Sequence, residues 1–316
     1  MGDSSTTFLR CARVVFTLRF LASGVVSRYW PNTFRGGFGM ALRETACVMK
    51  RETCDQCAIR RDCAYGYLFE TPITDADAVM RLYTHAPHPF VIEGREVATP
   101  LVQPGDTGKI GMVLIGEGYR FLPVIFLALQ RLGVKGLGRD AVPFEIIQIQ
   151  DEQGRDLYNR HSETGRLEAM EPKYLPMEPG SSRIGRFTVQ LATPLRLQTD
   201  GRVTRRPTFV DLVAALNRRV FLLRYFHEKN RDDAFAFCYI AVAESARVLE
   251  ATLYWKDRSR VSTRQNREVP LGGVAGFMRC IGDIGFLEPL LRAGEYVHVG
   301  KNATFGLGEI RLHVED

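Results

Sequence analysis

The order of predicted elements repeats along this chain, and this repetition constrains the fold more than any other feature of the sequence. Residues 12–21 and 186–197 both alternate apolar with largely polar side chains, which is typical of a half-buried strand. In each half the strand is followed by helical segments, and each half closes with a glycine-rich loop that enters a further strand. Self-similarity of this kind indicates two copies of one structural unit.

The lengths of the patterned segments suit a ferredoxin-like βαββαβ unit. The stretch around Pro31 and the glycines that follow it is expected to form turns, and the polar stretch 153–184 is expected to be a loop. Helices are predicted at 40–50, 122–133, 209–228, 233–246 and 284–293, and later strands at 248–262 and 267–278.

We therefore predict an α+β protein with two tandem ferredoxin-like (RRM-like) βαββαβ domains, glycine-rich loops and a Cys-rich insertion in the first domain. The expected boundaries are 1–160 for the N-terminal domain and 186–316 for the C-terminal domain, with a connecting segment at 161–185.

Basic residues outnumber acidic residues and gather in the second half. The chain has 42 Lys and Arg against 36 Asp and Glu, a formal net charge of +6. Six arginines lie in 201–224, and four arginines with one lysine lie in 256–268. The planar guanidinium group suits bidentate contacts with phosphate, so we expect a polyanionic partner.

Neither a secretory signal nor a transmembrane helix is expected. The N-terminal apolar stretch is interrupted by Arg10, Arg13 and Arg19, and no run of about 18 apolar residues occurs. The expected compartment is the cytoplasm, with no membrane partner. Cysteines are reduced there, so the seven cysteines do not imply disulfides.

Four cysteines are spaced as ligands of one metal ion, in the pattern C-x6-C-x2-C-x5-C at Cys47, Cys54, Cys57 and Cys63. Four thiolates in a reducing compartment more often bind zinc than form disulfides. An iron–sulfur cluster and a set of thiols without metal are the alternatives. A zinc ion with four thiolates has no open position, so we predict a structural zinc and no cofactor for catalysis.

Two glycine-rich loops are candidate phosphate sites, because glycine lets a backbone approach a ligand closely. The first contains Gly133, Gly136 and Gly138, and the second contains Gly300, Gly306 and Gly308 beside Lys301. A tight turn made for packing is the alternative. The first loop also matches part of a dinucleotide fingerprint, but it follows a helix and precedes a strand, which is the reverse of that motif. A nucleotide cofactor is therefore not expected.

Three segments together resemble a known family. They are FRGGFGMALRETAC at 34–47 with the cysteines that follow it, WKDRSRVSTRQNREVPLGGVAG at 255–276, and HVGKNATFGLG at 298–308. They resemble motifs of CRISPR-associated precursor-crRNA endoribonucleases of the RAMP superfamily. The resemblance implies tandem ferredoxin-like domains, a C-terminal RNA-binding domain, and CRISPR repeat RNA as the partner.

The resemblance also implies a reaction. A ribose 2′-OH would attack the adjacent phosphate without a metal ion, giving a 2′,3′-cyclic phosphate and a 5′-OH. The mature crRNA would then pass to subunits of a CRISPR effector complex.

This chemistry needs a base, an acid and cations near the phosphate. Members of the family often have a histidine early in the first domain, but the first histidine here is His85. His298 is our first candidate base because it precedes the glycine-rich loop, with Lys301 to stabilise charge on the phosphate. His227, at the end of an Arg-rich helix, is the second. A hydrogen bond in a strand and a helix-terminal charge are the respective structural alternatives.

A strand in the second half offers a track for RNA. Arg260, Ser262 and Arg264 alternate, so they are expected to share one face. Two guanidinium groups and a hydroxyl on one face suit a sugar–phosphate chain, whereas a solvated polar face is the alternative. The predicted RNA-binding set is Arg35, Lys256, Arg258, Arg260, Ser262, Arg264, Gln265, Gly300, Gly306 and Gly308.

Two other functions fit the same pattern. A non-catalytic RAMP subunit would share the fold and hold the crRNA end in an effector complex. A zinc-stabilised nucleic-acid-binding module would bind without preference for a repeat and with strong salt dependence.

Overall fold

The computed structural model describes residues 8–50, 53–71, 73, 86–162, 165–199, 201–228, 236–262 and 267–315. The chain divides into two compact units. One unit is Arg10–Lys173, and the other joins Met1–Leu9 to Tyr174–Asp316.

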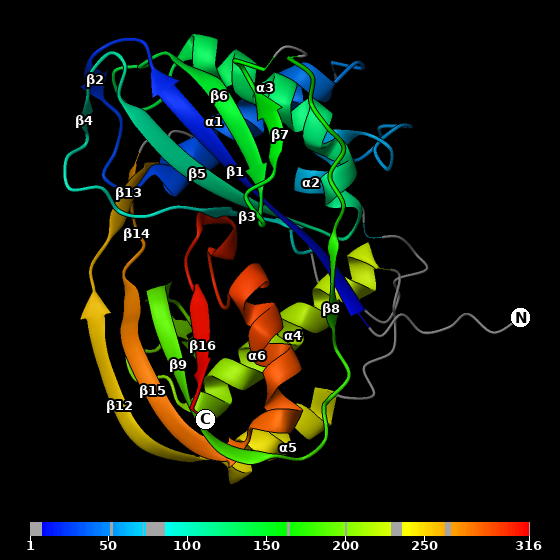
Figure 1. Ribbon diagram of the computed structural model, residues 1–316, viewed down its shortest axis with the longest axis vertical. Coiled ribbons are helices and arrows are strands. Elements are labelled where there is room, and N and C mark those ends of the chain that lie inside the picture. Colours follow the sequence, from blue (N-terminus) through cyan, green and yellow to red (C-terminus); the bar gives the residue numbers. More distant parts are fainter. Residues whose placement is uncertain are drawn as a thin grey trace, which may run out of the picture. The chain divides into compact units, whose positions relative to one another are not determined.

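The first unit is built on a six-stranded sheet (Figure 1). Its strands are β1 (Phe8–Phe20), β3 (Phe90–Glu93), β5 (Thr107–Ile115), β6 (Phe144–Asp151) and β7 (Asp156–Asn159) in the order β3-β5-β1-β6-β7, with β8 (Lys173–Pro176) pairing with β1. The helices are α1 (Trp30–Ala46), α2 (Ala64–Phe69) and α3 (Leu122–Lys135), and a small sheet pairs β2 (Gly24–Val25) with β4 (Leu101–Val102). Alternate residues of β1, among them Phe16, Leu18 and Phe20, are fully buried in the core of this unit.

Helix α1 begins at Trp30, so the prediction of turns before a helix at 40–50 is wrong. Pro31 occupies the first turn, where proline is tolerated because its missing N–H has no helical partner. The glycine at position 37 lets α1 pack closely, since a Cβ there would lie 2.7 Å from the Leu132 side chain of α3. Phe34 and Phe38 form a buried stripe at i,i+4 spacing. Tertiary packing therefore outweighs the low helix propensity of glycine.

The second unit contains a four-stranded antiparallel sheet in the order β12-β15-β9-β16. Its elements are β9 (Ile184–Leu195), α4 (Phe209–His227), α5 (Ala236–Ser245), β12 (Arg247–Lys256), β15 (Gly273–Asp283), α6 (Ile284–Val297) and β16 (Ile310–Val314). Helix α4 begins with a capping box, in which Thr208 and Asp211 exchange side-chain and backbone hydrogen bonds. Phe187 and Val189 of β9 are buried, whereas Gln190 is exposed.

Figure 1 shows α4 and α6 on one face of this sheet. No described helix of the second unit covers the opposite face, which we call the open face.

Both units have the strand order of a ferredoxin-like domain, with the first and third strands of the βαββαβ unit at the centre. In the first unit these are β1 and β5, and in the second they are β9 and β15. The predicted class of two tandem ferredoxin-like domains is confirmed.

Short strands lie where a loop was expected. Strands β7 and β8 fall within 153–184, and β7 pairs with β6 to extend the first sheet. Each has only four residues, too few for an alternating pattern to appear among polar neighbours.

The two long strands predicted at 248–262 and 267–278 are each interrupted. Beyond β12 and β15, the chain forms a separate hairpin of β13 (Ser259–Ser262) and β14 (Arg267–Pro270). At the break, Trp255 Nε1 donates to Asp257 Oδ1 at 2.6 Å, and the Leu271 N–H donates to the Arg258 carbonyl at 2.6 Å. A further hairpin pairs β10 (Gln198–Thr199) with β11 (Arg202–Val203).

Within the described residues, none of the helices combines the length and the apolar character needed to cross a membrane.

Candidate nucleic-acid interface

The loop between α6 and β16 turns on residues with positive φ. These are His298 (56°), Gly300 (83°), Asn302 (64°), Gly306 (79°) and Gly308 (71°). Gly308 must be glycine, because a Cβ there would lie 1.8 Å from the Val299 carbonyl oxygen. The sequence therefore specifies a loop that folds back on its own backbone.

The end of β9 holds this glycine-rich loop in place. The Lys301 N–H donates to the Arg196 carbonyl at 2.9 Å, and the Gly308 N–H donates to the Pro194 carbonyl at 3.1 Å. The buried Thr193 hydroxyl donates to the Gly306 carbonyl at 2.8 Å and accepts from the Glu309 N–H at 2.8 Å. The loop is thus fixed at both ends and in the middle.

Replacing Thr193 with valine is expected to lower the free energy of unfolding by about 1–3 kcal/mol, because one buried and one half-buried backbone group would lose their partner while the side-chain volume changes little. Urea unfolding followed by circular dichroism measures the change. Thr188→Val, on the same strand at a half-buried position, is the control and is expected to change stability by about 0.5 kcal/mol or less. Equal effects of the two changes would contradict the assignment of Thr193 as the anchor of the loop.

His298 lies inside this arrangement and not at its surface. Its side chain is fully buried, and its Nδ1 donates to the Leu307 carbonyl at 3.2 Å across the loop. A general base must come within hydrogen-bond distance of the proton that it removes. The placement of His298 therefore argues against the predicted catalytic role and favours the structural alternative.

His227 is the last residue of α4 and is 4% exposed. Its burial argues against the second predicted base for the same reason. Exposed histidines in the described chain are His161 and His313, which the sequence did not single out.

Arg219 supports the end of α6, a role that the sequence did not predict. Its Nε donates to the carbonyl of Val297, the last residue of α6, at 2.7 Å. A cation at a helix C-terminus is favourable for the helix dipole. Burial lowers the pKa of Arg219 to about 10, so the group keeps its charge at neutral pH. It fixes the end of α6 from which the glycine-rich loop starts.

Backbone pairing places three cationic residues at one end of the second sheet, which we call the cationic end: Lys256, Arg196 and Lys301. Lys256 ends β12 and pairs with Gly273 of β15. Next to it, Arg196 follows β9 and forms a parallel bridge with Gly300, which precedes Lys301. Lys256 and Lys301 are exposed, and Arg196 is half-buried, with its pKa lowered by burial.

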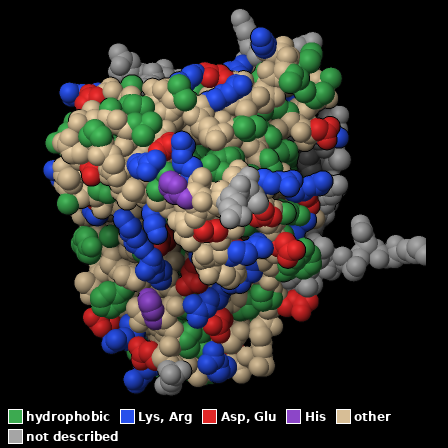
Figure 2. Space-filling view, turned by 45° about the horizontal axis from the view of Figure 1, so that its top comes forward, with side chains coloured by type: hydrophobic (Ala, Val, Ile, Leu, Met, Phe, Trp, Pro, Cys, Tyr) green, Lys and Arg blue, Asp and Glu red, His purple; other side chains and the backbone are tan. Residues whose placement is uncertain are grey.

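The cationic end gathers residues from three segments that are far apart in the sequence. Figure 2 shows that Lys and Arg side chains form several groups on one face of the molecule, with Asp and Glu side chains between some of them. Cationic residues at one end of a sheet can contact the phosphates of a nucleic acid.

The other predicted RNA-binding residues fall in different places. Arg35 lies on α1 of the first unit, with its guanidinium carbon 4.9 Å from the centre of the Phe69 ring. Arg258 is half-buried at the break between β12 and β13. Arg260 and Ser262 lie two residues apart on β13, and the structure describes only their backbone. Arg264 and Gln265 lie outside the described residues.

The four cysteines of the predicted zinc site are all half-buried in the first unit. Cys54 and Cys57 form a turn, with the Cys57 N–H donating to the Cys54 carbonyl at 3.1 Å. The Cys63 thiol lies 3.9 Å from the carbonyl of Ala46, which precedes Cys47. Burial, and after it the charge of Glu70, raises the pKa of the Cys54 thiol.

As placed, these thiols do not form a metal centre. Among the residues that the structure describes, no three His, Cys, Asp or Glu side chains are grouped so that they could hold a metal ion. The zinc site stays a prediction.

Family models match both halves of the chain. The AF_1859_N model, described as an N-terminal domain, matches residues 9–172, which is more than half of the chain. The model of the CRISPR-associated endoribonuclease Cas6 matches residues 189–310. A protein of Archaeoglobus fulgidus described as uncharacterized is 25% identical over 289 residues, covering 89% of this chain and 90% of its own length.

Solved structures show the same fold at low identity. A Cas6 product complex has a TM-score of 0.57 at 11% identity and covers 96% of this chain and 99% of its own. Thermus thermophilus Cas6 has a TM-score of 0.51 at 14% identity and covers 99% of this chain and 100% of its own. A chain of a partial Cas6-RT-Cas1–Cas2 complex has a TM-score of 0.51 at 15% identity. The match covers 98% of this chain and about half (47%) of the chain in the complex. The resemblance to precursor-crRNA-processing RAMP proteins is confirmed.

Proposed function

We propose that this chain, which belongs to the AF_1859_N family and has a CRISPR-associated endoribonuclease Cas6 domain at 189–310, cleaves precursor CRISPR RNA within its repeats. One observation carries the proposal. The Cas6 match spans the whole cationic end together with the glycine-rich loop that presents Lys301. The region that relates the chain to endoribonucleases is therefore also the region in which these three cationic residues lie.

The proposed reaction needs no metal ion. The ribose 2′-oxygen forms a bond to the adjacent phosphorus, and the bond from phosphorus to the 5′-oxygen breaks. The proton of the 2′-OH passes to a base, and the departing 5′-oxygen takes up a proton, leaving a 2′,3′-cyclic phosphate and a 5′-OH. Negative charge increases on the phosphoryl oxygens in the transition state, where the ammonium group of Lys301 would stabilise it.

The test is a cleavage assay with the repeat RNA of a CRISPR array from the source genome. We expect a single cut within the repeat in the presence of EDTA, a cyclic phosphate at the new 3′ end, and no cut in RNA with a 2′-deoxy sugar at the scissile position. Cleavage that stops in EDTA would contradict the metal-independent mechanism. Cleavage of the deoxy RNA would contradict attack by the 2′-OH.

A non-catalytic role in an effector complex is the second candidate. The burial of His298 and His227 favours it, because both candidate bases lie out of reach of a bound RNA. Tight binding of repeat RNA without any cut would support this alternative and exclude the endoribonuclease. The partners proposed in either case are CRISPR repeat RNA and subunits of a CRISPR effector complex.

We also propose a structural zinc ion that would draw Cys47, Cys54, Cys57 and Cys63 closer together than they lie in this structure. Their spacing and the turn between Cys54 and Cys57 support the proposal. We expect about one zinc per chain by plasma mass spectrometry and a loss of most of it in Cys57→Ser. Cys280→Ser, which changes a buried thiol in the second unit, is the control and should keep the zinc. Purified, folded protein that contains no zinc by the same measurement would contradict the proposal.

A further inference from the structure

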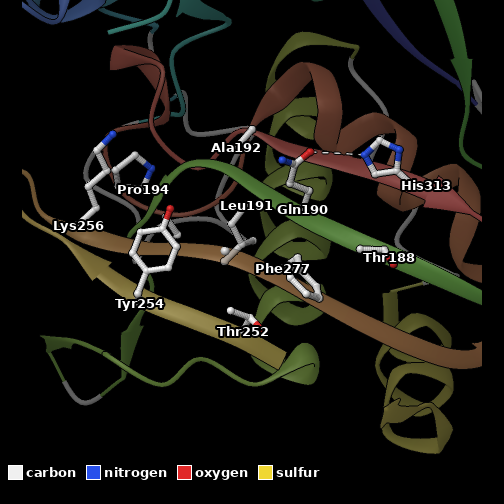
Figure 3. Close-up of a pocket in the computed structure, with 12 residues that line it drawn as sticks. Thr188, Gln190, Leu191, Ala192, Pro194, Thr252, Tyr254, Lys256, Phe277 and His313 are labelled. Atoms are coloured by element: carbon white, nitrogen blue, oxygen red, sulfur yellow. Dashed lines mark hydrogen bonds between the residues drawn. The ribbon is translucent and has the colours of Figure 1, made fainter. Parts of the chain in front are cut away.

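The open face of the second sheet contains a shallow cavity of about 440 Å³, which shares Lys256 with the cationic end but otherwise lies outside it. All four strands of the sheet contribute to its lining (Figure 3). Its volume lies in the range of sites that hold small ligands. Two aromatic side chains, Tyr254 and Phe277, and the amide of Gln190 are among the groups that line it (Figure 3).

The two aromatic residues lie on neighbouring strands. Phe277 of β15 is opposite Thr252 of β12, and Tyr254 is two residues further along β12. Diagonal neighbours of this kind have Cα atoms about 7–8 Å apart, within reach of large side chains. The Tyr254 side chain is 59% exposed, and Phe277 is half-buried. Tyr254 and Phe277 therefore form an aromatic pair of which one ring is exposed and the other half-buried.

Strand β15 contains a β-bulge just before Phe277. The register between β15 and β9 shifts between Val274 and Gly276, and Gly276 has a φ of 125°. A Cβ on Gly276 would lie 1.9 Å from the Thr252 carbonyl oxygen, so only glycine fits. Bulges occur near functional sites, where they change the direction of a neighbouring side chain. Here the neighbour is Phe277.

The position of Phe277 matches a general mode of RNA recognition. In RRM-like domains, aromatic side chains on the two central strands of the open sheet stack on unpaired bases. Strand β15 is one of the two central strands, and the residue opposite Phe277 on the other, β9, is Gln190. The Gln190 amide oxygen accepts from His313 Nε2 at 3.5 Å, so polar groups that can bond to base edges lie beside the rings.

Charge is arranged along the same face. Figure 3 shows Lys256 beside Tyr254, and Lys256 belongs to the cationic end. Further along the sheet, Arg279 pairs with Glu250 and Glu315. The exposed ammonium group of Lys256 would attract phosphates to the end of the cavity beside Tyr254, with bases over the aromatic pair.

We propose that the open face is a binding site for single-stranded RNA, in which bases stack on Tyr254 and Phe277 while the phosphates lie toward the cationic end. The identity of the polymer as RNA rests on the proposed function. A single strand fits because its base faces are free, whereas the bases of a duplex already stack on each other. The site would hold RNA outside the scissile phosphate, so binding there is separable from cleavage.

The test is fluorescence anisotropy with a labelled polyuridine RNA of about 12 nucleotides, a length within the range bound by single-strand-binding sheets. We expect Tyr254→Ala and Phe277→Ala each to weaken binding by about 5- to 100-fold, the range for the loss of one base–aromatic stack. Tyr254→Phe keeps the ring and should bind normally. Tyr174→Ala removes an equally exposed tyrosine away from the cavity and should also bind normally.

Salt dependence separates stacking from charge. Loss of a stack should leave the slope of log K against log salt unchanged, whereas Lys256→Ala should reduce its magnitude by about one. Polyuridine labelled with 5-iodouracil should cross-link to Tyr254 under ultraviolet light. Equal binding by wild type, Tyr254→Ala and Phe277→Ala would overturn the proposal, as would tighter binding of a duplex of the same length.

The cleavage assay is run separately on the same variants. If wild-type protein cleaves repeat RNA but the aromatic variants bind polyuridine as well as wild type, the cleavage proposal stands and the open-face proposal fails. If wild-type protein does not cleave but the aromatic variants lose polyuridine binding, the open-face proposal stands and the cleavage proposal fails. Circular dichroism excludes unfolding as the cause of lost binding, and Tyr254→Phe provides a variant that is expected to fold in any case.

Discussion

Lys301→Ala is expected to slow single-turnover cleavage of repeat RNA by about 100-fold or more, the cost of removing one group that stabilises transition-state charge. The residue is exposed on a loop that its own backbone hydrogen bond fixes to Arg196. Because that bond uses the Lys301 N–H and not the side chain, truncation to alanine leaves the loop intact. The free energy of unfolding should therefore change by about 0.5 kcal/mol or less.

Two measurements separate charge stabilisation from binding. The dissociation constant for RNA with a 2′-deoxy sugar at the cut site should rise only modestly, because one phosphate contact is lost. Lys301→Arg, which keeps the positive charge, should retain part of the rate. Lys135→Ala, which removes an exposed lysine paired with Glu44 on the first unit, is the control and should cleave at the normal rate. If Lys301→Ala lowers the cleavage rate by no more than the factor by which it weakens RNA binding, Lys301 contributes to binding alone.

The arrangement of helices and strands could largely be predicted from the sequence, because alternation and helical spacing report which faces are buried. They located α4 almost to the residue, from Phe209 to His227 against an expected 209–228. Helix α1 was shortened in the prediction because three glycines in 36–39 indicate turns when they are considered alone. The close approach of Gly37 to Leu132, which is 95 positions away in the chain, explains why glycine is suited to this helix.

The candidate site was harder to predict, since residue type does not reveal the direction of a side chain. His298 precedes a glycine-rich loop in the sequence, yet the loop folds over it and buries it. Arg196 carried no signal of its own, because its position in the cationic end depends on a bridge to Gly300. Arg219 appeared only as one of several arginines in a helix, although its side chain caps α6.

The aromatic pair shows the same limit. The alternation in 248–262 places Tyr254 on one face of a strand, but periodicity does not tell which face the helices cover. The covered face is the one on which α4 and α6 pack, and these helices come before and after β12 in the sequence. The open face is therefore a property of the assembled unit.

The glycine-rich loop offers the largest expected effect on stability. Gly308 combines a φ of 71° with a Cβ position 1.8 Å from the Val299 carbonyl oxygen. Gly308→Ala therefore adds backbone strain and a clash that only a movement of the main chain can relieve. We expect a loss of about 3 kcal/mol or more in the free energy of unfolding, measured by urea denaturation.

Gly201→Ala is the matched control for this change. Gly201 also has a positive φ, of 78°, but no atom lies within 4 Å of the position of its Cβ. The control should lose only the cost of the left-handed conformation, about 1–2 kcal/mol. The difference between the two variants isolates the close approach of the loop to Val299, and equal losses would contradict it. Since the same loop presents Lys301, Gly308→Ala should also reduce RNA cleavage at temperatures at which the protein is still folded, whereas Gly201→Ala should not.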